Sequence, residues 1–289
     1  MKILVTGATG FVGNQVISQL VTNYNHEIIA TAIETESIVK ERFFWFSKVK
    51  YVCQNLDENN INFFELFYKP DLVIHLSWAG LPNYQELFHI EKNLMSNYFF
   101  IKNLVENGIK EVVCIGTCFE YGLQNGCLKE DSVTEPSTMY GLAKDTLRKF
   151  IEKLQLKHQF GFNWLRLFYP YGKGQSPKSL LSQLELTIKN NEKVFNMSGG
   201  EQLRDYLTIE KVAEYIIKSS LQTNYNGIIN ICSGNPISVR KFVENYLEEN
   251  NFKLELNLGY YPYPDYEPFA FWGDKTKLNL ILEAKKNEG

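Results

Sequence analysis

The first thirteen residues, MKILVTGATGFVG, constrain the fold of this chain more than any other stretch. A short apolar run leads directly into Gly7, Gly10 and Gly13, and a helical segment follows without a break. In such a strand–turn–helix, the first glycine allows the tight turn, the second lets the backbone approach a pyrophosphate, and the third lets helix and strand pack closely. The amino end of the helix then faces the phosphates. The sequence therefore predicts a dinucleotide-binding unit at its amino end.

Short apolar β-branched runs alternate with longer helical segments through the first half of the chain. Runs that are apolar throughout indicate strands covered on both faces, as in a parallel sheet flanked by helices. The second half is richer in glycine, proline and aromatic residues, above all in GYYPYPDYEPFAFWGD. We predict an α/β fold, a Rossmann-like doubly wound parallel sheet with a smaller C-terminal substrate lobe. Residues 1–165 form the dinucleotide-binding domain, which 206–232 rejoin, whereas 166–205 and 233–289 form the lobe.

Composition excludes several classes of function. The 289 residues carry a formal net charge of −3 with no long block of either sign, which argues against a basic nucleic-acid-binding face. The five cysteines show neither CxxC spacing nor histidine partners, which argues against a zinc site and for a reducing compartment. No apolar stretch reaches the roughly 18 residues of a membrane span, and the first apolar run is too short for a signal peptide. We expect a cytoplasmic protein with no membrane or nucleic-acid partner and no metal.

The end of the second predicted strand leaves the choice of dinucleotide open. An acid is expected there to bind the adenosine ribose 2′-hydroxyl, but HEIIATAIETE places Ala32 at that point. Glu34 lies two residues further on and is the candidate substitute. No basic residue stands immediately beside it, although Lys40 and Arg42 follow, so a clear 2′-phosphate clamp is missing too.

STMYGLAKDTLRKF places Tyr140 and Lys144 four residues apart on a predicted helix. Residues at i and i+4 share one helix face, so the phenol and the ammonium can share one pocket. A neighbouring ammonium lowers the pKa of a phenol, which a tyrosine acid–base near neutral pH requires. The strand in EVVCIGT ends at Thr117, whose hydroxyl can hydrogen-bond the same substrate oxygen.

Taken together, the glycine triplet, Thr117, Tyr140 and Lys144 resemble the extended short-chain dehydrogenase/reductase family, in its NAD-dependent epimerase/dehydratase branch that acts on nucleotide sugars. The resemblance covers nearly the whole chain. Four further segments share it: DLVIHLS, RLFYPYGKGQ, GGEQLRDYLTIEKVAE and NICSGNPISVRKF.

The resemblance implies a role for each matching residue. Tyr140 would exchange a proton with a sugar oxygen, most often at C4, Thr117 would hydrogen-bond that oxygen, and Lys144 would bind the nicotinamide ribose. The pyrophosphate would be held by Gly7, Thr9, Gly10, Phe11, Val12 and Gly13. Asn55 and Leu56 would lie near adenine, and the nicotinamide ribose would be lined by Leu76, Ser77, Trp78 and Ala79.

The same resemblance implies a substrate site. Arg204 would pair with the diphosphate of the sugar nucleotide, a task suited to a guanidinium fork. Tyr169 stands where the family usually has a substrate-binding asparagine. Trp78 is a candidate wall of the sugar pocket, and Cys118 is a candidate contact to the sugar.

The two residues that follow Thr117 narrow the choice of reaction. Family dehydratases resemble T-D-E-x-Y-G and use the acidic pair as acid and base, whereas this chain has Cys118 and Phe119 at those positions. Reductases that also epimerise at C3 and C5 carry a cysteine two residues before the motif tyrosine, where this chain has Phe119. Both activities are therefore disfavoured.

Three hypotheses remain. The one we favour is NAD(P)H-dependent reduction of the 4-keto group of a nucleotide-activated 6-deoxysugar, with dTDP-4-dehydro-6-deoxyglucose as the first candidate and CDP or GDP sugars next. An NAD-dependent 4-epimerase would use the same residues but keep its cofactor bound. The missing acid at Ala32 fits a dissociating cofactor better and slightly favours NADPH over NADH. A non-catalytic dinucleotide-binding sensor is disfavoured because Tyr140 and Lys144 are both present.

Two predicted helices have apolar residues beyond those needed to cover the sheet. The helix over about 84–106 and the helix that carries Tyr140 include Leu87, Ile90, Leu94, Phe100, Ile101, Leu104, Leu147, Phe150, Ile151 and Leu154. Two such helices from each of two subunits can form a four-helix interface, so we predict a homodimer, as is common in the family.

Overall fold

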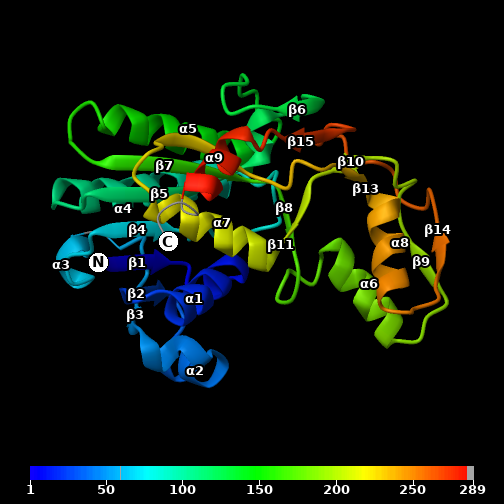
Figure 1. Ribbon diagram of the computed structural model, residues 1–289, viewed down its shortest axis with the longest axis horizontal. Coiled ribbons are helices and arrows are strands. Elements are labelled where there is room, and N and C mark those ends of the chain that lie inside the picture. Colours follow the sequence, from blue (N-terminus) through cyan, green and yellow to red (C-terminus); the bar gives the residue numbers. More distant parts are fainter. Residues whose placement is uncertain (59, 285–289) are drawn as a thin grey trace.

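The computed structural model describes residues 1–58 and 60–284, and its centre is a seven-stranded parallel sheet (Figure 1). In spatial order its strands are β12 (Gly227–Ile231), β7 (Gly161–Leu167), β5 (Glu111–Thr117), β4 (Leu72–His75), β1 (Lys2–Thr6), β2 (Glu27–Ala32) and β3 (Lys50–Cys53). Every neighbouring pair in this sheet is parallel. The predicted Rossmann-like fold is confirmed.

The inner strands bury side chains on both faces of the sheet. Along β1, Ile3 and Val5 belong to one hydrophobic core and Leu4 belongs to the other. This alternation follows from the two-residue period of a strand and explains why the run is apolar throughout.

Helices cover both faces. The first face is covered by α1 (Phe11–Asn23), α7 (Ile209–Leu221) and α9 (Thr276–Ala284), with α2 (Glu36–Arg42) and the 3₁₀ turn η1 (Phe44–Lys48) at its edge. The second face is covered by α3 (Phe63–Leu66), the wide helical turn η2 (His89–Leu94), α4 (Met95–Glu106) and α5 (Met139–Leu154). The helix expected from residue 84 therefore starts later, after a loop.

The order of the strands reverses beside β1. β2 lies on one side of β1, and β4 lies on the other. The loops that follow β1 and β4 thus diverge at the carboxyl edge of the sheet, which is where open α/β sheets bind ligands.

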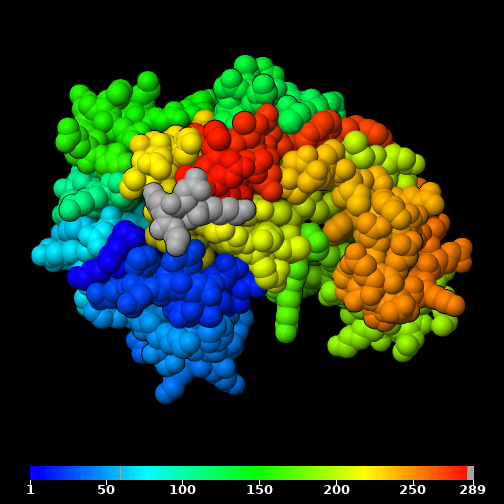
Figure 2. Space-filling model, viewed as in Figure 1, coloured from blue at the N-terminus to red at the C-terminus, as the bar shows by residue number. Residues whose placement is uncertain are grey.

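The small lobe forms one end of the molecule (Figure 2). It comprises α6 (Leu180–Lys189), β9 (Val194–Asn196), β10 (Leu203–Arg204), β13 (Ile237–Ser238), α8 (Val239–Glu249) and β14 (Glu255–Asn257). It has its own apolar core, in which Leu184 and Val243 are fully buried.

Two features tie the lobe to the sheet. β8 (Tyr169–Tyr171) pairs with β11 (Tyr206–Thr208), and β6 (Gly126–Leu128) pairs with β15 (Phe271–Gly273). Between them lies Asp205, which is fully buried. Its carboxylate accepts backbone N–H groups from Ser233, Gly234 and Gly273 at 2.7, 3.0 and 3.2 Å.

The C-terminal helix differs from the expected division of the chain. Leu278 and Ile281 of α9 are fully buried in the core shared with α1 and α7. α9 therefore packs on the larger body, whereas we expected all of 233–289 in the lobe. β12 and α7, within 206–232, complete the edge of the sheet. Within 1–58 and 60–284, no helix is long and apolar enough to cross a membrane.

Candidate active site

Three glycines shape the turn after β1. Gly7 has φ +63°, and a Cβ there would lie 2.9 Å from the backbone nitrogen of Ser77. A Cβ on Gly13 would overlap the carbonyl oxygen of Gly7. Gly10 is exposed and caps the amino end of α1 without a side chain. Gly7 and Gly13 thus let the turn pack closely on the loop after β4 and on the start of α1, while Gly10 leaves the amino end of α1 open at the cavity, which fits a dinucleotide pyrophosphate.

The carboxyl end of β5 is fixed by the buried Glu120. Its Oε1 accepts the backbone N–H of Thr117 at 2.8 Å and the Trp164 indole N–H at 2.9 Å. Its Oε2 accepts from Arg166 Nε at 2.7 Å. The Thr117 hydroxyl in turn accepts the backbone N–H of Phe119 at 3.3 Å, completing a capping box around the turn η3 (Cys118–Tyr121). Glu120 thus holds the strand end and orients Thr117.

Helix α5 presents Tyr140 and Lys144 to the same place. The Thr138 hydroxyl caps the helix by accepting the N–H of Gly141 at 3.0 Å. The Tyr140 N–H donates to the carbonyl of Tyr84 at 3.0 Å, which anchors the first turn. Lys144 Nζ donates to the carbonyl of Ile115 on β5 at 2.9 Å.

The protonation equilibria of this pair differ from the expectation. Burial is the main reason why the pKa of Tyr140 lies above its usual range, and nearby Tyr84, Glu120 and Cys118 raise it further. A hydrogen bond with Thr117 opposes that shift. Burial also lowers the pKa of Lys144 to about 8. We expected the ammonium to lower the phenol's pKa, but burial dominates and the ammonium is directed to the Ile115 carbonyl.

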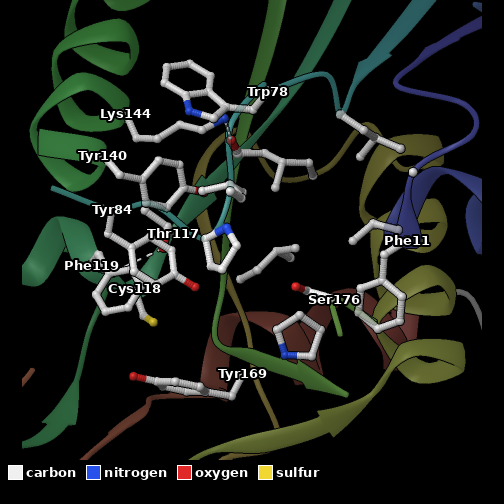
Figure 3. A pocket seen from close by; sticks show the side chains of 18 of the residues that line it. Phe11, Trp78, Tyr84, Thr117, Cys118, Phe119, Tyr140, Lys144, Tyr169 and Ser176 are labelled. Atoms are coloured by element: carbon white, nitrogen blue, oxygen red, sulfur yellow. Dashed lines mark hydrogen bonds between the residues drawn. The ribbon is translucent and has the colours of Figure 1, made fainter. Parts of the chain in front are cut away.

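The glycine turn, the end of β5 and the first turns of α5 line one cavity of about 630 Å³ between the sheet edge and the lobe (Figure 3). Among the predicted residues, its walls include Gly7, Gly10, Phe11, Val12, Gly13, Leu76, Trp78, Thr117, Cys118, Tyr140, Lys144 and Tyr169. Figure 3 shows Phe11 on one side of the cavity and Tyr140, Lys144 and Trp78 on the other. The predicted cofactor and catalytic groups therefore meet at one cavity.

Several lining residues were not among the predicted site residues. Tyr84, Phe119 and Tyr266 form an aromatic wall, with the Tyr84 and Phe119 ring centroids 4.8 Å apart and Tyr266 within 6.4 Å of both. Gln175, Ser176, Lys178 and Ser179 line the lobe side. The aromatic richness of 259–274 was the signal for Tyr266, whereas no motif pointed to Tyr84.

The Thr9 hydroxyl lies outside the cavity wall and donates to Glu34 Oε2 at 2.8 Å. The Tyr51 hydroxyl donates to the carbonyl of Glu34 at 2.6 Å. These contacts fix Glu34 beside the glycine turn, although Ala32 occupies the expected place of the acid. Four other predicted cofactor residues, Asn55, Leu56, Ser77 and Ala79, also lie outside the cavity wall, and Leu56 lines a separate surface hollow.

Arg204 departs from its expected place. Its side chain is almost fully buried, and Nη2 and Nε donate to Glu267 Oε2 at 2.7 and 3.1 Å. Nη1 donates to the carbonyls of Leu203 and Phe269. The guanidinium is thus bound within the protein by a carboxylate 63 residues away, and it does not line the cavity.

Tyr169 and Cys118 also line the cavity, Tyr169 at the bottom of Figure 3 and Cys118 beside Phe119 on the left. The Tyr169 hydroxyl is buried without a hydrogen-bond partner among the described residues. Burial raises the pKa of the Cys118 thiol, with Glu267 adding to the effect. A thiol in this state is a poor acid or base near neutral pH. The part of the chain that the structure describes contains no group of three His, Cys, Asp or Glu residues that could hold a metal.

Comparison with known proteins identifies the family. The model of the NAD dependent epimerase/dehydratase family matches residues 3–232. The chain is 28% identical over 278 residues to a dTDP-6-deoxy-L-talose 4-dehydrogenase (NAD(+)) of Aggregatibacter actinomycetemcomitans, covering 95% of this chain and 100% of that protein. It is 27% identical to a dTDP-4-dehydro-6-deoxyglucose reductase of Escherichia coli, covering 84% of this chain and 79% of that protein.

Solved structures share the fold. The UDP-glucuronic acid 4-epimerase of Bacillus cereus, in complex with UDP-glucuronic acid and NAD, superposes with a TM-score of 0.82 at 22% identity, covering 98% of this chain and 93% of the other. The family match spans the glycine turn, Thr117, Tyr140 and Lys144, so it confirms the resemblance drawn from these residues. The chain is therefore an enzyme that belongs to the NAD dependent epimerase/dehydratase family.

Proposed function

We propose that this enzyme interconverts a C4 ketone and a C4 hydroxyl on a nucleotide-activated 6-deoxysugar, and that it acts as a 4-keto reductase. One observation carries the proposal. Thr117 and Tyr140 meet at the wall of the cavity that the glycine turn also lines, while Cys118 and Phe119 follow directly on η3. The site therefore has the proton donor that a C4 reduction needs but lacks the acid and base that dehydration needs.

The names of two relatives support this choice of substrate. One is a 4-dehydrogenase of a dTDP-6-deoxy sugar, and the other is a reductase of a dTDP-4-dehydro-6-deoxy sugar. Both names describe oxidation or reduction at C4 of a 6-deoxyhexose. The aromatic wall of Tyr84, Phe119 and Tyr266 is also compatible with a C6 methyl group, since such walls favour apolar surface.

The residues of the chain divide the work as follows. Bound dinucleotide supplies the hydride that reduces C4. Tyr140 donates its hydroxyl proton to the C4 oxygen, and its raised pKa keeps that proton in place until negative charge develops there. The Thr117 hydroxyl donates a hydrogen bond to the same oxygen. The glycine turn and the amino end of α1 bind the pyrophosphate, and Lys144 binds the nicotinamide ribose.

We propose NAD(H) as the dinucleotide, in place of the preference for NADPH drawn from Ala32. The Glu34 carboxylate is held beside the glycine turn by the Thr9 hydroxyl, and the Tyr51 hydroxyl binds the backbone carbonyl of the same residue. A fixed carboxylate there repels a 2′-phosphate, and its second oxygen can accept a hydrogen bond from a ribose hydroxyl. The dTDP-6-deoxy-L-talose 4-dehydrogenase to which the chain is similar has NAD(+) in its name, which supports this choice.

The deciding experiment is incubation with dTDP-4-dehydro-6-deoxyglucose and either NADH or NADPH, followed by loss of reduced-nicotinamide absorbance and by product analysis. We expect NADH to be consumed and a 4-hydroxy product to form. Interconversion of two 4-hydroxy sugar nucleotides without added dinucleotide would instead identify a 4-epimerase. Dinucleotide binding without turnover of any sugar nucleotide would point to a sensor.

We also propose that the enzyme is a homodimer through α4 and α5. Most of the apolar residues predicted to form this interface are buried in the core of the subunit. Leu87 and Phe150 are exposed, at 56% and 38%. Phe99 of α4 and Leu142 of α5 are exposed as well, at 52% and 42%. Sedimentation equilibrium of Phe150→Lys against wild type tests this proposal, and a dimer that persists in the variant contradicts it.

A further inference from the structure

Trp78 lies across the ammonium of Lys144. The Lys144 Nζ is 4.0 Å from the centre of the indole ring, which is within the range of a cation–π interaction. Trp78 stands in the loop just after β4 and lines the cavity (Figure 3). Its ring also meets that of Tyr140 edge-on, with centroids 5.9 Å apart. One indole therefore contacts both side chains of the Tyr140–Lys144 pair.

The indole is fixed by His89, which is fully buried. The Trp78 indole N–H donates to His89 Nδ1 at 3.0 Å. His89 Nε2 lies 2.9 Å from the carbonyl oxygen of Asn83, which can only accept. The proton of the imidazole must therefore be on Nε2, and the lone pair of Nδ1 receives the indole. Burial also lowers the pKa of His89, which favours this neutral form.

No carboxylate forms an ion pair with Lys144 within 1–58 and 60–284. The titratable groups that face it are Cys114 on β5, Glu120 on η3, His75 on β4, His89 on η2 and Tyr140 one turn earlier on α5. Glu120 is committed to Arg166 and Trp164. The carbonyl of Ile115 and the face of Trp78 are thus the groups in direct contact with the charge.

We propose that Trp78, held in place by His89, is a positioning residue that keeps Lys144 protonated and in place at the wall of the cofactor pocket. The proposal rests on the role proposed above for Lys144 in binding the nicotinamide ribose. The indole face stabilises the ammonium against the cost of burial, and the His89 hydrogen bond prevents the indole from turning away. His89 acts only through Trp78, since its second nitrogen is committed to the backbone.

The test measures NADH affinity by fluorescence titration between pH 6 and pH 10. In wild type, affinity is expected to fall as the pH rises through the region of about 8 in which Lys144 loses its proton. In Trp78→Leu, which has no aromatic face, we expect the midpoint of this fall to lie lower by about one pH unit, and affinity at pH 8 to fall by about 3- to 10-fold. His89→Leu should move the midpoint in the same direction by less.

Two conservative variants separate positioning from folding. Trp78→Phe keeps a ring face, and His89→Gln keeps an acceptor for the indole N–H, so both should lie between wild type and the leucine variants. Trp45→Phe is the control, because the Trp45 indole N–H is also hydrogen-bonded, to Asn14 Oδ1 at 2.9 Å, but this buried side chain does not line the cavity.

The proposal is overturned if folded Trp78→Leu and His89→Leu keep the wild-type midpoint, or if Trp45→Phe moves it equally. Folding is checked by circular dichroism. This readout needs no sugar substrate. If the reductase proposal fails, the NADH titration can still be interpreted. If the Trp78 proposal fails, the turnover of sugar nucleotides still tests the reaction.

Discussion

Glu120 and Arg166 form an ion pair in which neither side chain is exposed beyond 1%. Glu120 Oε2 lies 2.7 Å from Arg166 Nε, and the same carboxylate binds the backbone N–H of Thr117. The pair joins β7 to η3, the turn that follows the end of β5 at Thr117. Glu120 therefore positions Thr117 and has no free oxygen with which to exchange a substrate proton.

Replacing Glu120 with Gln should destabilise the protein strongly. The Arg166 guanidinium would remain buried without a counter-charge, and such a loss typically costs about 3–5 kcal/mol. Chemical denaturation measures the change in the free energy of unfolding. Glu214→Gln is the control, because Glu214 pairs with Lys211 and Lys218 on the surface of α7 and should cost about 0–1 kcal/mol. Equal losses in the two variants would contradict this account.

Removing the hydroxyl of Tyr140 should abolish chemistry without abolishing cofactor binding. Loss of a positioned proton donor typically lowers kcat by about 10²- to 10⁴-fold. In Tyr140→Phe we expect that loss, with NADH affinity within about 3-fold of wild type. Tyr246→Phe, which removes a hydroxyl from the surface of α8, serves as the control. A Tyr140→Phe enzyme with full kcat would refute the proposed proton donor.

Changing Glu34 should alter the choice of dinucleotide. Glu34→Gln removes the charge that repels a 2′-phosphate, so we expect the affinity for NADPH relative to NADH to rise about tenfold or more. Ala32→Asp adds an acid at the usual place and should shift the ratio the other way. Isothermal titration with NADH and NADPH measures both effects independently of turnover. An unchanged ratio in Glu34→Gln would show that the carboxylate does not face the ribose.

Lys144→Met should make the protein more stable while inactivating it. Burial lowers the pKa of Lys144 from 10.5 to about 8, so between these pH values the unfolded chain binds the proton more tightly than the folded protein. Above about pH 10.5 Lys144 is neutral in both states and costs no stability. As the pH falls to about 8, the unfolded chain takes up the proton first, so the free energy of unfolding decreases. At pH 7 the variant should gain at most about 3 kcal/mol.

The gain from Lys144→Met should shrink between pH 8 and pH 10.5. Thermal or denaturant unfolding across that range measures it. Lys153→Met, at an exposed position on the same helix, should show no such pH dependence. A constant difference between Lys144→Met and wild type across the range would contradict the assigned pKa.

The features that the sequence predicted are those encoded within short segments. The turn from Gly7 to Gly13 and the helix face shared by Tyr140 and Lys144 follow from spacing alone, and the structure brings both to one cavity. The protonation of that pair did not follow, because it depends on how deeply α5 packs on β5 and on the carbonyl of Ile115.

Long-range pairing accounts for the other differences. Arg204 is bound by Glu267, 63 residues away, and no local pattern predicts that partner. The same is true of α9, whose Leu278 and Ile281 join a core built mostly from the first third of the chain and from α7. The partner of Glu34 is nearer in the sequence but also depends on tertiary structure. Its contact with Thr9 connects two loops that the pairing of β1 with β2 brings together.

The carboxylate of Asp205 connects segments that leave and re-enter the sheet at three different points of the chain. Because Ser233, Gly234 and Gly273 donate to the same buried group, none of these amides can open to solvent without disturbing the acceptor of the others. Native-state hydrogen exchange should therefore show the three amides protected as one cooperative unit. Exchange of Gly273 at a rate independent of Ser233 and Gly234 would instead mean that the C-terminal segment detaches by itself. A common rate would make the junction between lobe and sheet a single thermodynamic element, so the lobe and the returning chain would gain or lose order together.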